Sequence, residues 1–460
     1  MAATVSVART GNQNIDGILS GSRWASLNLT YSFPTKASYY GSNYGAWDEP
    51  HYNFGALNGN QIRAAREVFA MIASVSNLTF AEMAETSTSH ATLRLAVSDR
   101  ALPAWSYYPD PMEQGGDIWF GRANGWFDAP VLGSYGYYGF IHEILHSVGL
   151  KHGNETSMFG AMTSSRDSME FSALTYRSYV GATGQYVENE TWGYAQTPMM
   201  YDIAALQYMY GADYTTNAGN TVYRWSSGTG QEFINGVGQA TPGGNRIFST
   251  IWDGGGNDTY DLSNYSTNLS LDLRPGEWSR LSTTQIAKLG EGHYARGNIA
   301  NALTYGNDSR SLIENAVGGS GNDTVTGNKA ANNLKGGGGN DRLYGREGND
   351  VLTGGSGNDA FYFNTKPDRT SNLDQIVDFS VPNDTVYLDR SVFTVLKAGT
   401  LPTAAFWIGS KAHDSSDRIV YDSVKGELHY DTDGSGSAAS VQFALLTKGL
   451  KMTAADFMIV

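Results

Sequence analysis

The 460-residue chain contains no cysteine, which excludes disulfide bonds, thiolate metal ligands and a cysteine nucleophile. Basic residues are scarce as well: 31 lysines and arginines face 45 aspartates and glutamates, for a formal net charge of −14. Nucleic acids and anionic membranes bind clustered cations, so we expect neither as a partner. No apolar run reaches the roughly 18 residues that a membrane-spanning helix needs, so we expect no membrane span.

The two halves of the chain differ in pattern. Residues 1–20 lack the apolar segment of a Sec-type signal peptide, so we expect an N-terminal arm there that could include a short propeptide. Up to residue 212, strand-like alternation (Leu27–Phe33) and helical periodicity (Asn60–Ser74) are mixed, which predicts an α+β domain. Beyond residue 213 the helical signal fades, and much of the glycine (55 residues in all) lies there.

A strict repeat of nine residues runs through this glycine-rich half. Its rows begin at Gly318, Gly327, Gly336, Gly345 and Gly354. The sixth position holds Asp323, Asn332, Asp341, Asp350 and Asp359, and the eighth holds Val325, Leu334, Leu343, Leu352 and Phe361. An isolated copy begins at Asp253. A flexible linker needs neither this period nor an apolar residue in register, so the repeat predicts ordered structure.

Each row predicts a tight turn followed by a short strand. Glycine permits positive φ in the turn, whose carbonyl and aspartate oxygens converge on one point, while the apolar eighth side chain points inward. Stacked rows would align the carboxylates, which repel one another unless a hard cation such as Ca²⁺ lies between them. The row with Asn332 in place of aspartate should therefore be a weaker site.

These rows resemble the RTX nonapeptide repeats, a family that implies a parallel β-roll loaded with structural calcium and folded after export. We expect several Ca²⁺ ions, with ligands from Asp253, Gly255, Gly256, Asp258, Glu314, Gly318, Ser320, Asp323, Gly336, Gly338, Asn340, Asp341, Gly345, Glu347, Asp350, Gly354, Ser356 and Asp359. The roll is predicted over residues 213–380, and a further β region over residues 381–460. Within the latter, Asp431–Gly436 is interpreted as a hairpin turn, with a calcium loop as the alternative.

The N-terminal half carries a second motif, H-E-x-x-H-x-x-G-x-x-H, from His142 to His152. On a helix, His142 and His146 lie one turn apart on one face and can share one Zn²⁺ ion. Gly149 can end the helix in a left-handed turn, so that His152 approaches the same metal. Three protein ligands leave one position open for water, which distinguishes a catalytic zinc site from a structural one.

Glu143 lies beside this predicted metal without being a ligand. It can accept a proton from water and later pass it to the leaving amine, acting first as general base and then as general acid. The alternative is a helix with surface histidines and a solvated glutamate. Such a helix would not need the glycine and the third histidine at these spacings.

The extended motif is the metzincin signature. Together with the nonapeptide rows, it makes nearly the whole chain resemble the serralysins, which are secreted bacterial zinc metalloproteases. The resemblance also rests on Thr197–Asp213 and on Leu29–Phe33 before Pro34. It implies type I secretion, directed by an uncleaved C-terminal segment with an acidic and then apolar ending, which Asp456–Val460 matches.

The same resemblance implies a further residue at the zinc site. Serralysins have a Met-turn beneath the metal and, two residues later, a tyrosine that stabilises the oxyanion. Tyr176 matches that tyrosine, whereas Leu174 stands at the structural Met-turn position. Leucine is close to methionine in volume, so this exchange should cost less than ~1.5 kcal/mol. Met199 and Met200, the rival Met-turn residues, are expected instead to begin the helix that closes the domain.

The sequence thus predicts an α+β zinc metalloprotease domain (residues 1–212) followed by an all-β parallel roll. We expect a secreted, extracellular, monomeric endopeptidase with one catalytic zinc ion, whose protein or peptide substrates pair with an edge strand near Asp117–Phe120. The type I secretion machinery and a proteinaceous inhibitor are further expected partners. One alternative is a calcium-binding surface or adhesion module with a degenerate protease domain, which only Leu174 supports. The other is a zinc enzyme for a non-peptide substrate, which no residue favours.

Overall fold

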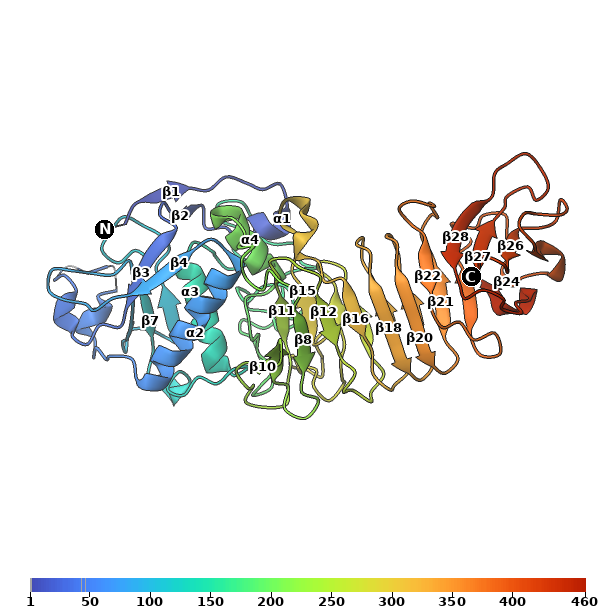
Figure 1. The fold of residues 1–460 in the computed structure, drawn as a ribbon. Coiled ribbons are helices and arrows are strands. Elements are labelled where there is room, and N and C mark those ends of the chain that lie inside the picture. The colour runs from blue at the N-terminus through green and yellow to red at the C-terminus, as the bar shows by residue number, and fades with distance from the viewer. Residues whose placement is uncertain (1, 43, 46) are drawn as a thin grey trace.

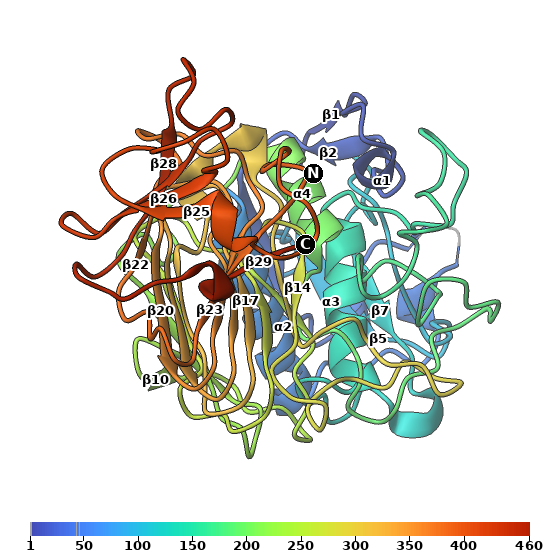
Figure 2. The same cartoon turned by 90° about the vertical axis from the view of Figure 1, so that its right-hand side faces the viewer.

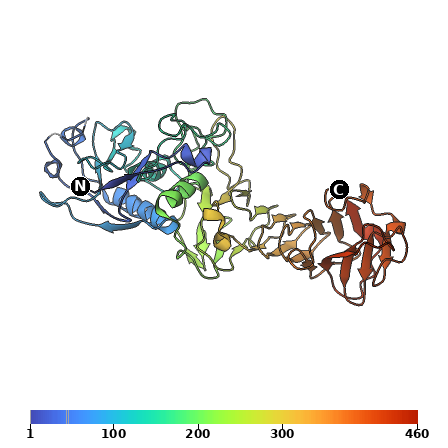
Figure 3. The same ribbon diagram turned by 90° about the horizontal axis from the view of Figure 1, so that it is seen from above.

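The computed structural model describes residues 2–42, 44–45 and 47–460, which form two parts of different architecture (Figure 1). The N-terminal part, blue to cyan in the figure, combines helices with a small sheet. The C-terminal part is a stack of short strands that leads away from it toward the C-terminus. Seen from above, the two parts give the molecule an elongated outline (Figure 3).

A five-stranded sheet frames the N-terminal part. Its order is β4–β3–β5–β7–β6, with bounds Thr79–Glu82, Asn28–Ser32, Leu93–Val97, Ile118–Phe120 and Ala104–Ser106. Four strands are parallel, and β6 runs antiparallel to β7. The prediction of an edge strand near Asp117–Phe120 is therefore wrong, because β7 pairs with β5 on one side and with β6 on the other, and β6 forms the edge of the sheet. Three residues in a proline-flanked loop are too short to display the alternation of a strand.

Two helices pack against this sheet. Helix α2 (Gly59–Val75) begins with a capping box: Asn58 Oδ1 accepts the backbone N–H of Gln61, and Gln61 Oε1 accepts that of Asn58. Helix α3 (Tyr135–Ser147) is buried along most of its length and begins at the N-cap Ser134. It is the central helix of the N-terminal part, and it carries the histidine motif.

Helix α4 (Met200–Tyr210) closes the N-terminal part and starts directly after Met199, as predicted. The first strand of the stack, β8 (Val222–Trp225), follows within a dozen residues. No helix in the described ranges is long and apolar enough to cross a membrane.

The N-terminal arm is attached to the segment that follows the histidine motif. Strand β1 (Thr4–Ser6) pairs antiparallel with β2 (Ser22–Trp24), and the short helix α1 (Gln13–Asp16) lies between them in sequence. Lys151 is buried, and its Nζ donates to the carbonyl oxygens of Gly17 (2.5 Å), Glu155 (2.8 Å) and Gly160 (3.1 Å). One buried cation thus joins the arm to this segment.

The nonapeptide rows form a parallel β-roll with two facing sheets. One sheet contains β12 (Thr259–Asp261), β16 (Asn315–Val317), β18 (Asn333–Gly338), β20 (Val351–Ser356) and β22 (Asp374–Ile376). The other contains β13 (Ser270–Asp272), β17 (Thr324–Thr326), β19 (Arg342–Tyr344), β21 (Ala360–Phe363) and β23 (Thr385–Leu388). Figure 2 views the molecule from the C-terminal end of this roll.

Successive rows alternate between the two sheets. Leu334 pairs with Leu352 in one sheet and Val325 with Leu343 in the other, so that one full turn of the roll comprises two nine-residue rows. All eighth-position side chains are fully buried. The prediction that they point inward is confirmed, although they form two facing columns rather than one.

Further strands close both ends of the roll. At its start, β8 continues into β9 (Glu232–Ile234) and β10 (Val237–Gly238), next to a separate sheet of β11 (Ser249–Ile251), β15 (Ile299–Asn301) and β14 (Trp278–Ser279). At its end lie β24 (Gly399–Thr400), β25 (Phe406–Ile408), β26 (Ile419–Asp422), β27 (Glu427–Tyr430), β28 (Val441–Leu445) and β29 (Phe457–Ile459). The segment Asp431–Gly436 lies in the connection of the β27–β28 hairpin, with Asp431 Oδ1 accepting the N–H of Gly434 at 2.9 Å. Asp433 Oδ1 is covered and has no hydrogen-bond partner within the described ranges, so the calcium loop stays the alternative to a plain turn.

Candidate metal centre

The three histidines of the motif come together at one point. His142 Nε2 lies 3.1 Å from His146 Nε2, and both lie 3.0 Å from His152 Nε2. The first two side chains are buried on helix α3, while His152 is partly exposed. The spacing of the three histidines in the motif thus places their Nε2 atoms around a single position.

A glycine makes this convergence sterically feasible. Gly149 follows helix α3 with φ = +109°, and a Cβ at this position would lie 2.5 Å from the carbonyl oxygen of Ser22. The N–H of Leu150 then bonds back to the carbonyl of Leu145 at 3.2 Å. The left-handed residue reverses the chain at the helix end, and His152 is brought back toward the helix.

The hydrogen bonds of the histidines fix their tautomers. His142 Nδ1 lies 2.8 Å from the carbonyl oxygen of Ala173, His146 Nδ1 2.7 Å from that of Leu150, and His152 Nδ1 2.6 Å from Glu155 Oε1. Because these partners are acceptors, each Nδ1 carries a hydrogen and each Nε2 presents a lone pair. Three lone pairs at this separation repel one another unless a cation lies between them. The donor set and its outer hydrogen bonds therefore fit Zn²⁺.

Glu143 is buried beside the histidines, and its Oε2 accepts a hydrogen bond of 2.9 Å from Ser106 Oγ. Burial raises the pKa of the Glu143 carboxyl to about 8, and a cation held by the adjacent histidines would lower it again, toward the ionised form that can accept a proton. Tyr176 lies on the other side of the site, with its ring centroid 4.4 Å from that of His152. Burial raises the pKa of its hydroxyl to about 12, so Tyr176 is a hydrogen-bond donor at neutral pH.

The turn beneath the site is held by helix α4. Asp202 Oδ2 accepts the N–H groups of Ala173 (2.7 Å) and Met199 (2.8 Å), and Ala173 in turn supplies the carbonyl that bonds His142. Leu174 is fully buried in this turn, where its carbonyl accepts the N–H of Gly153 at 2.7 Å. Leu174, at the predicted Met-turn position, thus makes packing and backbone contacts.

Three residues near the centre escaped the sequence prediction. Ser106 lies on β6, and a strand of three residues is too short to be predicted from its sequence pattern. Tyr108 lies two residues after Ser106, beyond the end of β6. Its ring packs edge-on against that of His146, with the ring centroids 5.6 Å apart. Glu155 could have been found, since an acidic residue three positions after His152 is well placed to bond its ring.

The turns of the roll contain acidic oxygens without partners. In Asp258, Asp341, Asp350 and Asp359, Oδ2 is covered and has no hydrogen-bond partner within the described ranges. The Oδ1 atoms are satisfied, since each accepts a backbone N–H from a neighbouring strand, as in Asp323 N to Asp341 Oδ1 (2.7 Å). Burial raises the pKa of Asp341 to about 7 and that of Asp350 to about 9. Rows of buried carboxylates fit a hard cation such as Ca²⁺.

The first glycine of each row leaves room for these carboxylates. A Cβ on Gly336, Gly345 or Gly354 would collide with the aspartate oxygen of its own row. The isolated copy of the repeat that begins at Asp253 also brings acidic residues together. Asp253 and Asp258 lie close to each other, and the N–H of Asp258 donates to Glu314 Oε2 at 2.8 Å. The carboxylates of these residues are close together, and their role as calcium ligands stays a prediction.

Other predicted calcium residues differ from this pattern. Asp323 has both oxygens satisfied, because Oδ1 accepts the N–H of Leu269 and Oδ2 that of Gly319, each at 2.7 Å. Asn340 Oδ1 accepts the N–H of Asn358 at 2.8 Å. Glu347 is exposed and its side chain lies 3.8 Å from Arg346. Of the remaining residues, Gly255, Gly256, Gly318 and Ser320 lie in the turns, whereas Gly338 and Ser356 end strands β18 and β20.

Two residues continue the carboxylate columns outside the strict period. Asp374 Oδ1 accepts the N–H of Asp350 at 3.1 Å, and Asp384 Oδ1 accepts that of Asp359 at 2.9 Å. They follow their predecessors by 24 and 25 positions instead of 18, because a longer loop intervenes. A search for a nine-residue period therefore misses them.

The Asn332 row replaces the missing carboxylate with amide hydrogen bonds. Asn332 is buried, and its Nδ2 donates to the Glu314 carbonyl (2.9 Å) and to Asn328 Oδ1 (3.1 Å). Asn328, also buried, donates to the carbonyls of Leu273 (3.1 Å) and Ile313 (2.7 Å). In this turn amide N–H groups stand where other turns have unpaired carboxylate oxygens.

Comparison with known proteins identifies the family. A family model described as "Peptidase M10 serralysin C terminal" matches residues 212–459. Metalloprotease AprA of Pseudomonas entomophila is 34% identical over 447 residues, covering 91% of this chain and 84% of that protein. Serralysin B of Dickeya chrysanthemi is 33% identical over 65% of this chain and 58% of its own length, and serralysin of Proteus mirabilis is 29% identical over 66% and 60%. The two-part fold and the histidine motif agree with these matches, and the chain belongs to the serralysin family of metalloproteases.

Proposed function

We propose that this protein is a secreted zinc endopeptidase in which His142, His146 and His152 hold the metal. The observation that carries the proposal is the convergence of three Nε2 lone pairs within 3.1 Å, each fixed by an Nδ1–H bond to an acceptor. Names of the relatives support the same class, because they include a metalloprotease and several serralysins.

When bound, the zinc ion would polarise the scissile carbonyl and make water nucleophilic at neutral pH. Glu143 accepts the proton of the attacking water at its carboxylate and then delivers it to the leaving amine nitrogen. Tyr176 donates a hydrogen bond from its hydroxyl to the oxyanion that develops on the carbonyl oxygen. Ser106 holds the Glu143 carboxylate in position through its bond of 2.9 Å.

Substrate binds in extended form along β6 in this proposal. The strand pairs with β7 on one side only, and it carries Ser106, which contacts Glu143. A peptide added to the free edge would be aligned by backbone hydrogen bonds next to the proton-accepting carboxylate. This assignment replaces the earlier expectation for residues 117–120.

The roll is proposed to bind several calcium ions between its rows. Unpaired Oδ2 atoms in four aspartates support this, since a covered carboxylate without a partner costs free energy that a cation would offset. Calcium would then act in folding, because the rows have small apolar areas and repelling charges without it. Removal of calcium should unfold the roll, as followed by far-UV circular dichroism.

Export by type I secretion is proposed from the ending Asp456–Val460. Deleting these residues would also remove β29, in which Phe457 and Ile459 are buried against the roll. Addition of Gly–Gly–Ser after Val460 keeps the strand but displaces the terminus. We expect extracellular yield to fall while the intracellular enzyme, refolded with calcium, stays active; an unchanged yield would refute the proposed signal.

The first experiment is metal analysis of the purified protein beside casein hydrolysis with and without EDTA. We expect about one zinc and several calcium ions per chain, with activity abolished by EDTA. The variant Glu143→Ala should retain zinc and lose hydrolysis by several orders of magnitude. Calcium without zinc or activity would instead indicate a degenerate protease domain on a calcium-binding scaffold.

A further inference from the structure

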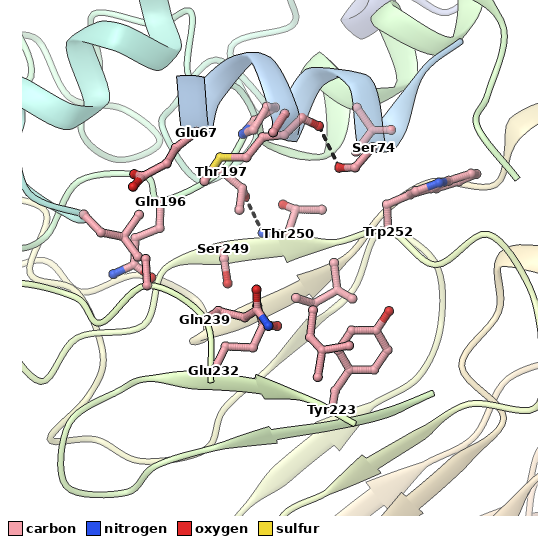
Figure 4. Close-up of a pocket in the computed structure, with 18 of the residues that line it drawn as sticks. Glu67, Ser74, Gln196, Thr197, Tyr223, Glu232, Gln239, Ser249, Thr250 and Trp252 are labelled. Carbon is pink, nitrogen blue, oxygen red and sulfur yellow. Dashed lines mark hydrogen bonds between the residues drawn. The ribbon is translucent and has the colours of Figure 1, made fainter. Parts of the chain in front are cut away.

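A cavity of about 520 Å³ lies between the N-terminal part and the start of the roll. Its walls are helix α2, the segment before α4, the β8–β9 hairpin and strand β11 (Figure 4). None of the histidine-site residues lines it. The cavity is therefore separate from the metal centre.

The lining combines apolar walls with acidic groups. Met71, Trp225 and Ile234 contribute apolar surface, while Glu67 and Glu232 are the acidic residues. No lysine, arginine or histidine is among the described residues that line the cavity. Glu232 thus lies in the pocket without a counter-cation, whereas Glu67 Oε1 lies 3.8 Å from Arg63 Nε on the same helix.

The two carboxylates differ in their bonding. Glu67 Oε2, near one end of the cavity, accepts a hydrogen bond of 3.0 Å from the Tyr137 hydroxyl. Glu232 Oε1 is fully covered and has no hydrogen-bond partner in the described part of the chain. Burial alone raises the pKa of Glu232 to about 7, because nothing nearby compensates the loss of water. A cationic donor that reached this carboxyl group would supply the partner that it lacks.

The polar side chains around Glu232 are uncharged. Figure 4 places the Gln239 side chain beside Glu232, with Ser249 opposite on β11. The amide nitrogen of Gln239 is engaged, since Nε2 donates to the Val237 carbonyl at 2.9 Å. Its carbonyl oxygen and its second amide hydrogen are left for a ligand. Ser249 is buried, and its hydroxyl can donate or accept a hydrogen bond.

We propose that this cavity binds a small primary amine, with its ammonium group on Glu232 and Gln239 and its apolar body against Met71, Trp225 and Ile234. The site offers the uncompensated negative charge of Glu232, acceptor oxygens and no cationic side chain of its own, which favours a cationic donor. The apolar walls select an aliphatic or aromatic body over a hydrated metal ion.

The test uses the full-length protein with zinc and calcium and the probe 2-phenylethylamine. Its neutral counterpart, 2-phenylethanol, has the same shape with a hydroxyl in place of the ammonium group. Isothermal titration should give saturable 1:1 binding of the amine, and the alcohol should bind at least tenfold more weakly. Equal affinities of amine and alcohol, or no saturable binding of the amine, would overturn the proposal.

Site-directed variants locate the binding. Glu232→Gln keeps the side-chain shape and removes an unpaired charge, so it should fold and lose at least tenfold in amine affinity. Glu277→Gln, outside the cavity and exposed by 51%, should bind as the wild type does. Undiminished amine binding by Glu232→Gln, together with competition against casein, would place the amine at the active site and refute the assignment.

Discussion

Ser106 Oγ donates a hydrogen bond of 2.9 Å to Glu143 Oε2, joining edge strand β6 to the helix that carries two of the three histidines. No other hydrogen bond to the Glu143 carboxylate forms among the described residues. The strand proposed to align the substrate is thus the strand that orients the proton-accepting group.

We expect Ser106→Ala to lower kcat about tenfold with little change in KM. A hydrogen bond to a charged group contributes about 1.5–3 kcal/mol, and 1.36 kcal/mol corresponds to a factor of ten in rate. Steady-state kinetics on a fluorogenic peptide measures both constants. Ser106→Thr, which retains the hydroxyl, should keep most of the activity, and zinc content should be unchanged in both variants. A wild-type kcat for Ser106→Ala would contradict the role.

Asp202→Asn should weaken zinc binding about tenfold, because hydrogen-bonded residues behind metal ligands typically contribute 10- to 100-fold in affinity. The amide cannot accept all three hydrogen bonds that Asp202 receives, and the Ala173 carbonyl that holds His142 would shift. Competition with a chromogenic chelator measures the zinc affinity. The exposed Asp128→Asn serves as the control. Equal affinities in both variants would show that the turn is positioned by other contacts.

Lys151→Met should lower the melting temperature of the N-terminal part by about 10 °C. The substitution keeps most of the buried volume but leaves three carbonyl oxygens without their donor, a loss of about 3 kcal/mol. Differential scanning calorimetry measures the transition. Lys36→Met removes the same charge from an exposed position and should have little effect. Similar melting of both variants would mean that the arm is held without this cation.

Asn332→Asp should raise the calcium concentration at which the roll folds. The new carboxylate loses the two hydrogen bonds that the amide donates and adds a charge next to Asp350, whose Oδ1 accepts the N–H of Asn332 at 2.8 Å. Calcium titration followed by circular dichroism gives the midpoint. Asn358→Asp adds the same charge at an exposed position three rows later and is the control. A lower midpoint for Asn332→Asp would be the opposite of this expectation.

The histidine motif and the repeat could be predicted because each is local in sequence. A helix fixes the relation of His142 to His146, and the nine-residue period fixes which side chains of the roll point inward. The serralysin assignment and the two-part fold class are confirmed. In contrast, the edge position of β6 depends on long-range pairing that three residues cannot encode.

Contacts between residues far apart in the chain could not be predicted from the sequence either. Ser106 reaches Glu143 over 37 positions, and Asp384 reaches Asp359 over 25, outside the repeat. The roles of Glu143 and Tyr176 and the individual calcium ligands stay predictions, because the structure supplies their geometry but not their chemistry.

The paired amides of Asn328 and Asn332 have a consequence for the order in which the roll assembles. Linear repeat structures gain most of their stability from contacts between neighbours, so any unit that is stable early can serve as a seed. This turn closes with hydrogen bonds from its own side chains, whereas the turns around it contain carboxylates that need a cation. Growth from the seed would then proceed outward in both directions as calcium becomes abundant, which places the starting point of folding in the interior of the roll instead of at its ends.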